Sequence, residues 1–579
     1  MSLQLRTLKK MQKSLILKNN LCQAFIFTCW DSSIKRVAKD LCIKLCEVLK
    51  NKTTRRCYLT FVKKKWRCCL MRFLPSGEQM RKADMYTIEE IGIPSLVLME
   101  RAALGVVDVL IREAVELSNI LIVCGAGNNG GDGFAVGRIL YQKGYKVELY
   151  FIGGSKESYI SKECKKQMDI CINLGMVIHT GNSPDMFSKK YSAIIDAIFG
   201  VGLTRLLSKE YCSILDRINK MQGHKIAIDI PSGVCSSTGQ IQGNVLKADL
   251  TIAIQCEKRG TVLFPGSAYA GKVKCVDIGI VVDVFFTDDY KKKVCFTYEP
   301  KDVPKLMPRR TPNSHKGTYG KVLMITGSQG MSGAAYLSGK GAYAVGAGLV
   351  KIYTSMDNKE IIQGQLPEAV VAAYEETSVD LSELSKLLKW ADIVCIGCGL
   401  GQSEASREVF SYTLSNISSP VVIDADGVNM LRDHKNLLEN LKHPCVLTPH
   451  MKEMANLLDI TVDELVEKPI KNLTEFVEKY PVTCVLKDAR TFVNRKGSRI
   501  FINTSGNNAM AKAGSGDVLA GFVTGLAAGG LDVYESSCLG VYLHGLAGDA
   551  AKESLGSYSV LASDIVDGIS KVLSGIITV

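Results

Sequence analysis

The sequence predicts an α/β protein with two doubly wound, three-layer domains, and three observations support this fold class. The chain has 579 residues, of which 46% are hydrophobic and 52 are glycine, enough for two large domains. In both halves, short β-branched runs alternate with segments of helical periodicity, which is the pattern of parallel sheets. Several of these runs end in glycine- or aspartate-rich turns, where open parallel sheets bind their ligands.

Basic residues are concentrated in the first 72 residues, which carry 18 Lys or Arg against three acidic residues. The net charge of the whole chain is +13, so the remainder is close to neutral and gives no sign of nucleic-acid or membrane binding. We expect residues 1–72 to be a basic extension, poorly ordered or non-native, and a transit peptide fits the segment equally well. No apolar run has the length of a transmembrane helix. The 20 cysteines show no disulfide or zinc pattern, so we expect a reducing, cytoplasmic location.

Residues 73–290 form the first predicted domain. Glu78 to Glu90 and Pro94 to Glu116 have helical periodicity, and a strand at Ile120 to Cys124 runs into the glycine-rich turn Gly125 to Gly133. A helix from Phe134 and a strand ending at Ile152 complete a strand–turn–helix–strand unit, which is typical of nucleotide-binding folds.

Two later strands of this domain are expected to end in polar clusters, Asp196 to Gly202 and Asp229 to Gly233. Because parallel strands end at one edge of a sheet, Asn129, Asp196, Asp229 and Ser232 are predicted to converge on one cleft. The alternative is that these residues form separate helix caps and turns.

Residues 291–318 are expected to form a linker, because they combine a lysine run with four prolines and an arginine pair. The second predicted domain, residues 319–579, again alternates strands and helices. Strands are expected at Lys321 to Ile325, Ala391 to Ile396, Pro420 to Ile423, Val446 to Leu447 and Cys484 to Leu486.

The stretch Asn507 to Leu526 contains Gly514-Ser515-Gly516-Asp517, a glycine turn that runs into a helix of small residues. The free N–H groups and the dipole of the helix N-terminus predict an anion site, most often one for phosphate. A carboxylate beside such a site repels phosphate, unless Asp517 acts as the base that takes a proton from an attacking hydroxyl. These four residues fit equally well a glycine-rich turn with an aspartate cap.

The motifs taken together resemble the bifunctional NAD(P)H-hydrate repair enzymes, in which an epimerase domain is joined to a nucleotide-dependent dehydratase domain. The resemblance runs from about Ser76 to Ile576. It rests on nine motifs in order: Gly92 to Glu100, Gly125 to Gly133, Asp196 to Leu203, Asp229 to Gly233, Lys258 to Gly266, His315 to Gly317, Gly397 to Gly401, Thr448 to Glu453 and Asn507 to Gly521. It implies an N-terminal Rossmann-like fold and a C-terminal ribokinase-like fold.

The resemblance implies that the first domain interconverts the R and S hydrates of NADH and NADPH. It implies a potassium ion held by Asn129, Asp196 and Ser232, and Asp196 as a proton-transfer group. The residues that look like hydrate contacts are Asn128, Asn129, Gly130, Gly131, Asp132, Gly200, Val201, Gly202, Leu203, Thr204, Arg205, Leu206 and Asp229.

For the second domain the resemblance implies dehydration of the S hydrate, with ADP or ATP and Mg²⁺, and with Asp517 as the catalytic base. Hydrate contacts are expected at Ala334, Gly399, His450 and Asp517. The residues that look like nucleotide contacts are Lys487, Asp488, Ala489, Arg490, Thr491, Asn507, Asn508, Ala509, Met510, Ala511, Lys512, Ala513, Gly514, Ser515 and Gly516. We expect small-molecule substrates and a homo-oligomer.

Three residues depart from the family pattern. Asp488 replaces a glycine that is usual after Lys487, Val201 a threonine and Arg101 an asparagine. Two alternatives stay open at this point: a vitamin or sugar kinase with a regulatory N-terminal domain, and a first domain that only binds a partner.

Overall fold

The computed structural model describes residues 71–577, except for 154–159, 182–185, 288–289, 291–292, 433 and 440. Met71–Val579 form one compact unit. The sequence predicts a basic extension over residues 1–72. Residues 1–70 of this extension lie outside the described residues. Within the described residues, no helix is both long enough and apolar enough to cross a membrane.

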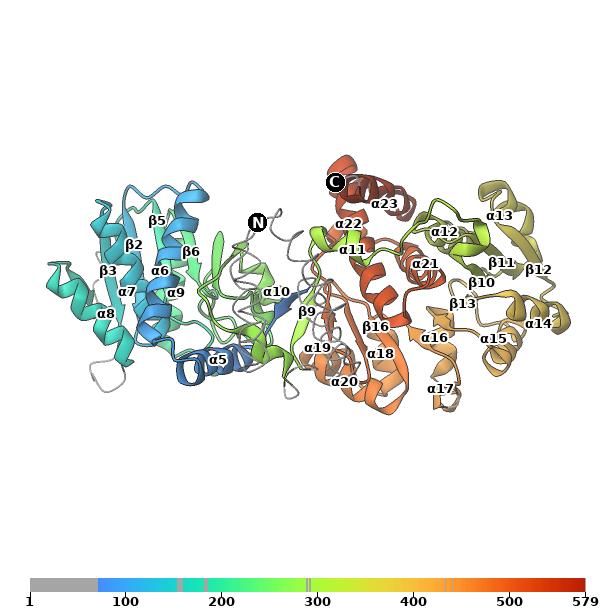
Figure 1. Cartoon of the computed structure of the whole chain (residues 1–579), viewed down its shortest axis with the longest axis horizontal. Coiled ribbons are helices and arrows are strands. Elements are labelled where there is room, and N and C mark those ends of the chain that lie inside the picture. Colours follow the sequence, from blue (N-terminus) through green and yellow to red (C-terminus); the bar gives the residue numbers. More distant parts are fainter. Residues whose placement is uncertain are drawn as a thin grey trace, which may run out of the picture. The chain divides into compact units, whose positions relative to one another are not determined.

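The first sheet has seven parallel strands in the order β4-β3-β2-β5-β6-β7-β8, and its strands β3, β2, β5 and β6 are labelled in Figure 1. The strands are β2 Ile120–Gly125, β3 Val147–Ile152, β4 Ile178–Thr180, β5 Ala193–Ala197, β6 His224–Ile228, β7 Leu250–Ile254 and β8 Lys272–Val276. The chain leaves β2 toward β3 on one side and returns to β5 on the other. The carboxyl ends of β2 and β5 therefore form the switch point where such sheets bind ligands.

Helices cover both faces of this sheet. The helices are α5 Gly77–Met85, α6 Ser95–Arg112, α7 Asn128–Gln142, α8 Lys162–Asn173, α9 Lys209–Lys220 and α10 Arg259–Val262. Alternate residues of β2 point to opposite sides, so that Ile122 lies in the same core cluster as Phe134 of α7, and Val123 in the cluster that contains Leu215 of α9. This is the three-layer arrangement that the sequence predicts.

The second sheet has eleven strands in the order β1-β9-β18-β17-β16-β15-β14-β13-β10-β11-β12. The seven strands from β16 to β12 are mutually parallel, and β17 is antiparallel to its neighbours. The strands are β1 Arg72–Leu74, β9 Cys295–Thr297, β10 Lys321–Ile325, β11 Leu349–Ser355, β12 Val370–Tyr374, β13 Ile393–Ile396, β14 Val421–Ile423, β15 Cys445–Leu447, β16 Val482–Leu486, β17 Phe492–Arg495 and β18 Phe501–Ile502. The switch point lies between β10 and β13.

This sheet also has helices on both faces (Figure 1). Met324 of β10 lies in the same core cluster as Phe522 of α21, whereas Leu323 lies in the cluster that contains Val409 of α15. The helices are α11 Val303–Leu306, α12 Ser332–Ala344, α13 Lys359–Gln365, α14 Leu381–Trp390, α15 Glu404–Asn416, α16 Asp426–Leu431, α17 Asn436–Glu439, α18 Met451–Leu458, α19 Val462–Glu467, α20 Pro469–Lys479, α21 Ser515–Ala528, α22 Val533–Ser559 and α23 Ala562–Ile577. The predicted fold class, two doubly wound α/β domains, is confirmed.

Two short strands outside the predicted second domain belong to its sheet. β1 precedes the first sheet in the chain, and β9 follows it within the expected linker. β1 pairs antiparallel with β9, and β9 pairs with β18. The chain thus contributes to the second sheet before it builds the first one.

Candidate active sites in the two domains

The glycine-rich turn after β2 is already the first turn of α7, which begins at Asn128 rather than near Phe134. Glycine is required there, because a Cβ atom at Gly130 would lie 1.8 Å from the carbonyl oxygen of Gly125. This close approach places Asn129 at the helix N-terminus, where backbone N–H groups lack helical partners. The amide nitrogen of the Asn129 side chain is buried and has no hydrogen-bond partner. The amide is therefore available to a ligand.

Asp196 lies at the end of β5 and is buried against the loop that follows β6. Its carboxylate accepts hydrogen bonds from the Ser232 backbone N–H at 2.8 Å, the Ser232 hydroxyl at 2.7 Å and the Ile198 N–H at 3.1 Å. Burial raises the pKa of Asp196 to about 6, although these hydrogen bonds oppose the rise. The structure thus joins two of the three predicted potassium ligands.

The third predicted ligand, Asn129, lies next to Gly200. A Cβ atom at Gly200 would lie 3.2 Å from Asn129 Oδ1 and 3.1 Å from Asp229 Oδ2, so these two side chains meet where Gly200 leaves room. In the rest of the 200–206 segment, Leu203 is buried and Leu206 is 73% exposed. The side chains of Thr204 and Arg205 are also exposed.

Asp229 directly follows β6 in a left-handed conformation, with a φ of 72°. Its Oδ1 atom accepts the Ile254 N–H at 3.2 Å and forms a buried ion pair with Lys258. Burial and the charges of Asp229 and Asp84 raise the pKa of Asp132 well above its usual range, while Lys258 lowers it. Asp132 therefore interacts electrostatically with the pair formed by Asp229 and Lys258. The first candidate site therefore contains three carboxyl groups and one lysine.

In the second domain, Gly514 adopts the left-handed conformation directly before α21, with a φ of 87°. A Cβ atom there would also lie 2.6 Å from Leu337 Cδ1. A larger residue at this position would thus be both strained and crowded. The turn places Asp517 in the first turn of α21, beside the free N–H groups of the helix.

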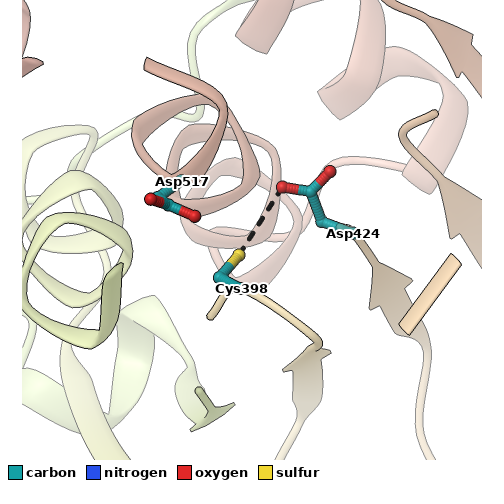
Figure 2. A group of neighbouring side chains, drawn as sticks. All are labelled: Cys398, Asp424 and Asp517. Carbon is teal, nitrogen blue, oxygen red and sulfur yellow. Dashed lines mark hydrogen bonds between the residues drawn. The ribbon is translucent and has the colours of Figure 1, made fainter. Parts of the chain in front are cut away.

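Asp517 points toward Cys398 and Asp424, which lie at the ends of β13 and β14 (Figure 2). One ligand atom from each of the three side chains lies within 4.8 Å of the other two. Burial and the neighbouring Asp424 raise the pKa of Asp517 to about 6, while the Cys398 thiol and Lys487 act in the opposite direction. A carboxylate with such a pKa ionises near neutral pH and is still basic enough to accept a proton.

Asp424 is buried and accepts hydrogen bonds from the Lys487 ammonium and the Thr448 hydroxyl, both at 2.6 Å. Its carboxylate brings Lys487 into the cluster around Asp517. Arg490, three residues further on, donates to the Val262 carbonyl oxygen at 3.0 Å and lies over the Phe264 ring. Within the predicted nucleotide segment 487–491, Lys487 thus lies in the cluster around Asp517, whereas Arg490 contacts Val262 and Phe264.

The other predicted nucleotide segment, residues 507–516, is anchored at its start. Asp549 of α22 accepts from the Asn507 side chain at 2.8 Å and from the Gly506 N–H at 3.0 Å. Ala511, Lys512 and Ala513 are exposed ahead of the glycine turn. The segment is thus fixed at one end and open where it approaches α21.

His450 caps α18, where its Nδ1 atom accepts the Glu453 N–H at 3.0 Å and leaves Nε2 near a Glu453 oxygen at 3.2 Å. Burial and the nearby Lys487 lower the pKa of His450, and burial raises the pKa of Glu453 to about 7. Ala334 and Gly399 lie against each other, since a Cβ atom on Gly399 would be 2.7 Å from that of Ala334.

The donor groups fit the two expected cations differently. Asp196 and Ser232 offer buried oxygen atoms, and Asp196 makes no ion pair within the described residues, so the chemistry suits potassium. The cluster of Cys398, Asp424 and Asp517 does not suit Mg²⁺, which requires oxygen ligands. Its thiol is a soft ligand, and Asp424 is already paired with Lys487.

Three residues of these sites were missed by reasoning from the sequence: Lys258, Cys398 and Asp424. Asp424 follows a predicted strand and could have been found by the same argument that identified Asp196. Cys398 forms a C-x-x-C pair with Cys395, and both residues lie at the end of the same predicted strand. Lys258 begins one of the motifs of the family resemblance, but only its burial beside Asp229 marks it as a residue of the site.

Fold and sites together define a two-domain α/β protein with a cluster of polar side chains at the switch point of its first sheet and a carboxylate at a helix N-terminus in its second domain. Residues 95–260 match the model for the YjeF-related protein N-terminus, and residues 322–571 match the model for NAD(P)H-hydrate dehydratase. The chain belongs to the family of bifunctional NAD(P)H-hydrate repair enzymes.

Two curated members of that family show the extent of the similarity. The enzyme of Moorella thermoacetica is 33% identical over 518 residues, which cover 86% of this chain and 96% of the relative. The Escherichia coli enzyme is 30% identical over 502 residues, covering 87% and 94%. Among solved structures, an ADP/ATP-dependent NAD(P)H-hydrate dehydratase from Bacillus subtilis, crystallised with ATP and Mg²⁺, is 28% identical with a TM-score of 0.44. It covers 48% of this chain and 98% of its own.

Proposed function

We propose that this chain repairs hydrated nicotinamide cofactors in two steps. The first domain interconverts the R and S hydrates. The second dehydrates the S hydrate to NADH or NADPH, with ADP or ATP as phosphoryl donor, and releases phosphate with AMP or ADP. The observation that carries the proposal is the position of Asp517 at the N-terminus of α21, where a base and an anion site lie side by side.

In the proposed dehydration, Asp517 takes the proton of the 6-hydroxyl group, whose oxygen then attacks the terminal phosphoryl group. The bond between that phosphorus and the bridging oxygen breaks, and AMP or ADP leaves. The N–H groups at the start of α21 and the Lys487 ammonium stabilise the negative charge that develops on the phosphoryl oxygens. Mg²⁺ is proposed only as the partner of the nucleotide phosphates, because the cluster at Asp517 does not suit it.

The phosphorylated intermediate then loses phosphate, which distinguishes this reaction from that of a kinase. The lone pair of the ring nitrogen forms a double bond to the 6-carbon as the carbon–oxygen bond breaks. Loss of a proton from the neighbouring carbon restores the dihydronicotinamide ring. A phosphotransferase site thereby acts as a dehydratase.

In the first domain, Asp196 is the proposed proton-transfer group, and Asn129 and Asp229 are proposed hydrate contacts. The orphan amide of Asn129 supports a polar ligand at this position. Residues 73–290 are proposed as the epimerase domain, 291–318 as the linker and 319–579 as the dehydratase domain. We also propose a cytoplasmic homo-oligomer, whose subunit number sedimentation analysis would measure.

The buried oxygen atoms of Asp196 and Ser232 lead to a prediction about potassium. Replacing K⁺ by tetramethylammonium should lower the rate of epimerisation at least severalfold, because the bulky cation cannot enter between buried oxygens. Dehydration of purified S hydrate in the same buffers should stay unchanged. Equal epimerisation rates with both cations would remove the potassium assignment.

The raised pKa of Asp517 predicts the pH dependence of dehydration. The base must be ionised, so kcat/KM for the S hydrate should fall about tenfold per pH unit below about pH 6 and level off above it. The groups that set this pKa are Asp424, Lys487, Cys398 and Asp426. Initial rates corrected for spontaneous breakdown of the hydrate would test it, and a profile without an acidic limb would argue against Asp517 as the base.

The remaining alternative is a vitamin or sugar kinase with a regulatory first domain, which the glycine turn and Asp517 alone would also fit. The two functions differ in the fate of the phosphoryl group. Repair predicts one inorganic phosphate for each NADH or NADPH formed. A stable phosphorylated product without release of phosphate would instead support the kinase. The assignment to the family favours repair.

A further inference from the structure

The buried ion pair between Lys258 and Asp229 carries an inference beyond the hydrate contacts of the family. We propose that Lys258 is a positioning residue for epimerisation, which holds one oxygen of Asp229 and thereby directs the other oxygen toward the substrate beside Gly200 and Asn129. This proposal rests on the epimerase function proposed above, and its test separates the two.

Lys258 is 1% exposed, and its ammonium group has two acceptors. One is Asp229 Oδ1 and the other is the Ile254 carbonyl oxygen at 2.6 Å. Asp229 Oδ1 also accepts the Ile254 N–H at 3.2 Å. One oxygen of the carboxylate is therefore fixed from two directions by the end of β7.

The segment that carries Lys258 is held in place on either side. Gln255 adopts a left-handed conformation with a φ of 63°, and its side-chain oxygen accepts the N–H groups of Ile278, Gly279 and Ile280 at 3.0 to 3.1 Å. Glu257 forms an ion pair with Arg72. Lys258 thus points at Asp229 from a backbone with little freedom to move.

The second oxygen of Asp229 faces the site. A Cβ atom on Gly200 would lie 3.1 Å from Asp229 Oδ2 and 3.2 Å from Asn129 Oδ1. The Asn129 amide nitrogen next to this point is buried without a partner. Asp229 therefore contacts Lys258 through one oxygen, while its other oxygen faces Gly200 and Asn129.

A purely structural role explains this arrangement poorly. A buried ion pair contributes little net stability compared with an apolar pair of the same volume. Asp229 also keeps a left-handed backbone that costs free energy for a residue with a side chain. Such strain is typical of sites where the direction of one side chain matters.

The test is a double-mutant cycle on R-to-S conversion by the full chain, with Lys258→Met, Asp229→Asn and the double variant. Lys258→Met should lower kcat/KM about 10²-fold, as expected when a reacting group is misplaced. The double variant should be no slower than Asp229→Asn alone, because Lys258 acts through Asp229. Dehydration of purified S hydrate by every variant should stay within twofold of wild type.

The exposed Lys272 at the start of β8, paired with Glu113 at the end of α6, provides the control variant Lys272→Met, which should epimerise like wild type. Absence of epimerisation by wild type would refute the proposed function itself. Wild-type rates for Lys258→Met, or losses that multiply in the double variant, would overturn only the role of Lys258. If Lys258→Met fails to fold, the double variant leaves no unpaired charge, and a rate well below that of Asp229→Asn would still overturn the role of Lys258.

Discussion

Asp517→Asn should lower the rate of dehydration about 10²- to 10⁴-fold, which is the usual contribution of a general base. Asparagine keeps the shape of the side chain at the start of α21 but cannot take up the proton of the 6-hydroxyl group. The free N–H groups of Gly516 and its neighbours remain, so nucleotide affinity should change little. Stopped assays of NADH recovery from S hydrate, together with calorimetric titration of ADP and ATP, would measure both quantities.

The control for this variant is Asp463→Asn, an exposed carboxylate in the first turn of α19 of the same domain. It should dehydrate at the wild-type rate. Full activity of Asp517→Asn would remove Asp517 as the base. Equal losses of nucleotide affinity and rate would instead assign the residue to binding.

Asp196→Ala should abolish R-to-S conversion while dehydration of S hydrate is preserved. The substitution removes a proposed proton-transfer group and a carboxylate that accepts three hydrogen bonds from Ser232 and Ile198. Each buried donor left without a partner costs about 1–3 kcal/mol, so the first domain should also unfold at a lower temperature. Chiral chromatography of the hydrates would follow the conversion.

Asp196→Asn separates the loss of chemistry from the loss of stability. Its amide oxygen can still accept hydrogen bonds from Ser232, but the side chain carries no charge. Epimerisation should stay low in this variant while the thermal midpoint recovers toward wild type. An unchanged epimerisation rate in either variant would contradict the catalytic role of Asp196, and Asp283→Ala, at an exposed position, serves as a neutral control.

Much of the fold was predictable because buried parallel strands are short, β-branched and followed by glycine or aspartate. The strand Lys321–Ile325 has the expected bounds, and β2 extends the expected strand only to Gly125. β1 and β9 could not be assigned to the second sheet, because their pairing joins residues more than 200 positions apart. Three-residue strands carry too little pattern to predict such long-range contacts.

Site residues that follow strands could be predicted from the sequence, whereas properties that depend on burial could not. Asp196 and Asp517 could be identified from the motifs around them. Burial raises the pKa of both residues, and the neighbouring Asp424 raises that of Asp517 further; no local pattern reveals either effect. The pairing of Lys258 with Asp229 likewise appears only when β6 and β7 lie next to each other.

The most direct test of the two-step repair uses purified residues 71–579 and a mixture of R and S hydrates. Recovery of dihydronicotinamide absorbance in the near ultraviolet would be followed with ADP, with ATP and without nucleotide. The account predicts complete recovery of both epimers with one of the nucleotides, and release of one phosphate per cofactor. Recovery of the S share alone would contradict the epimerase, and no recovery with either nucleotide would contradict repair and favour the kinase.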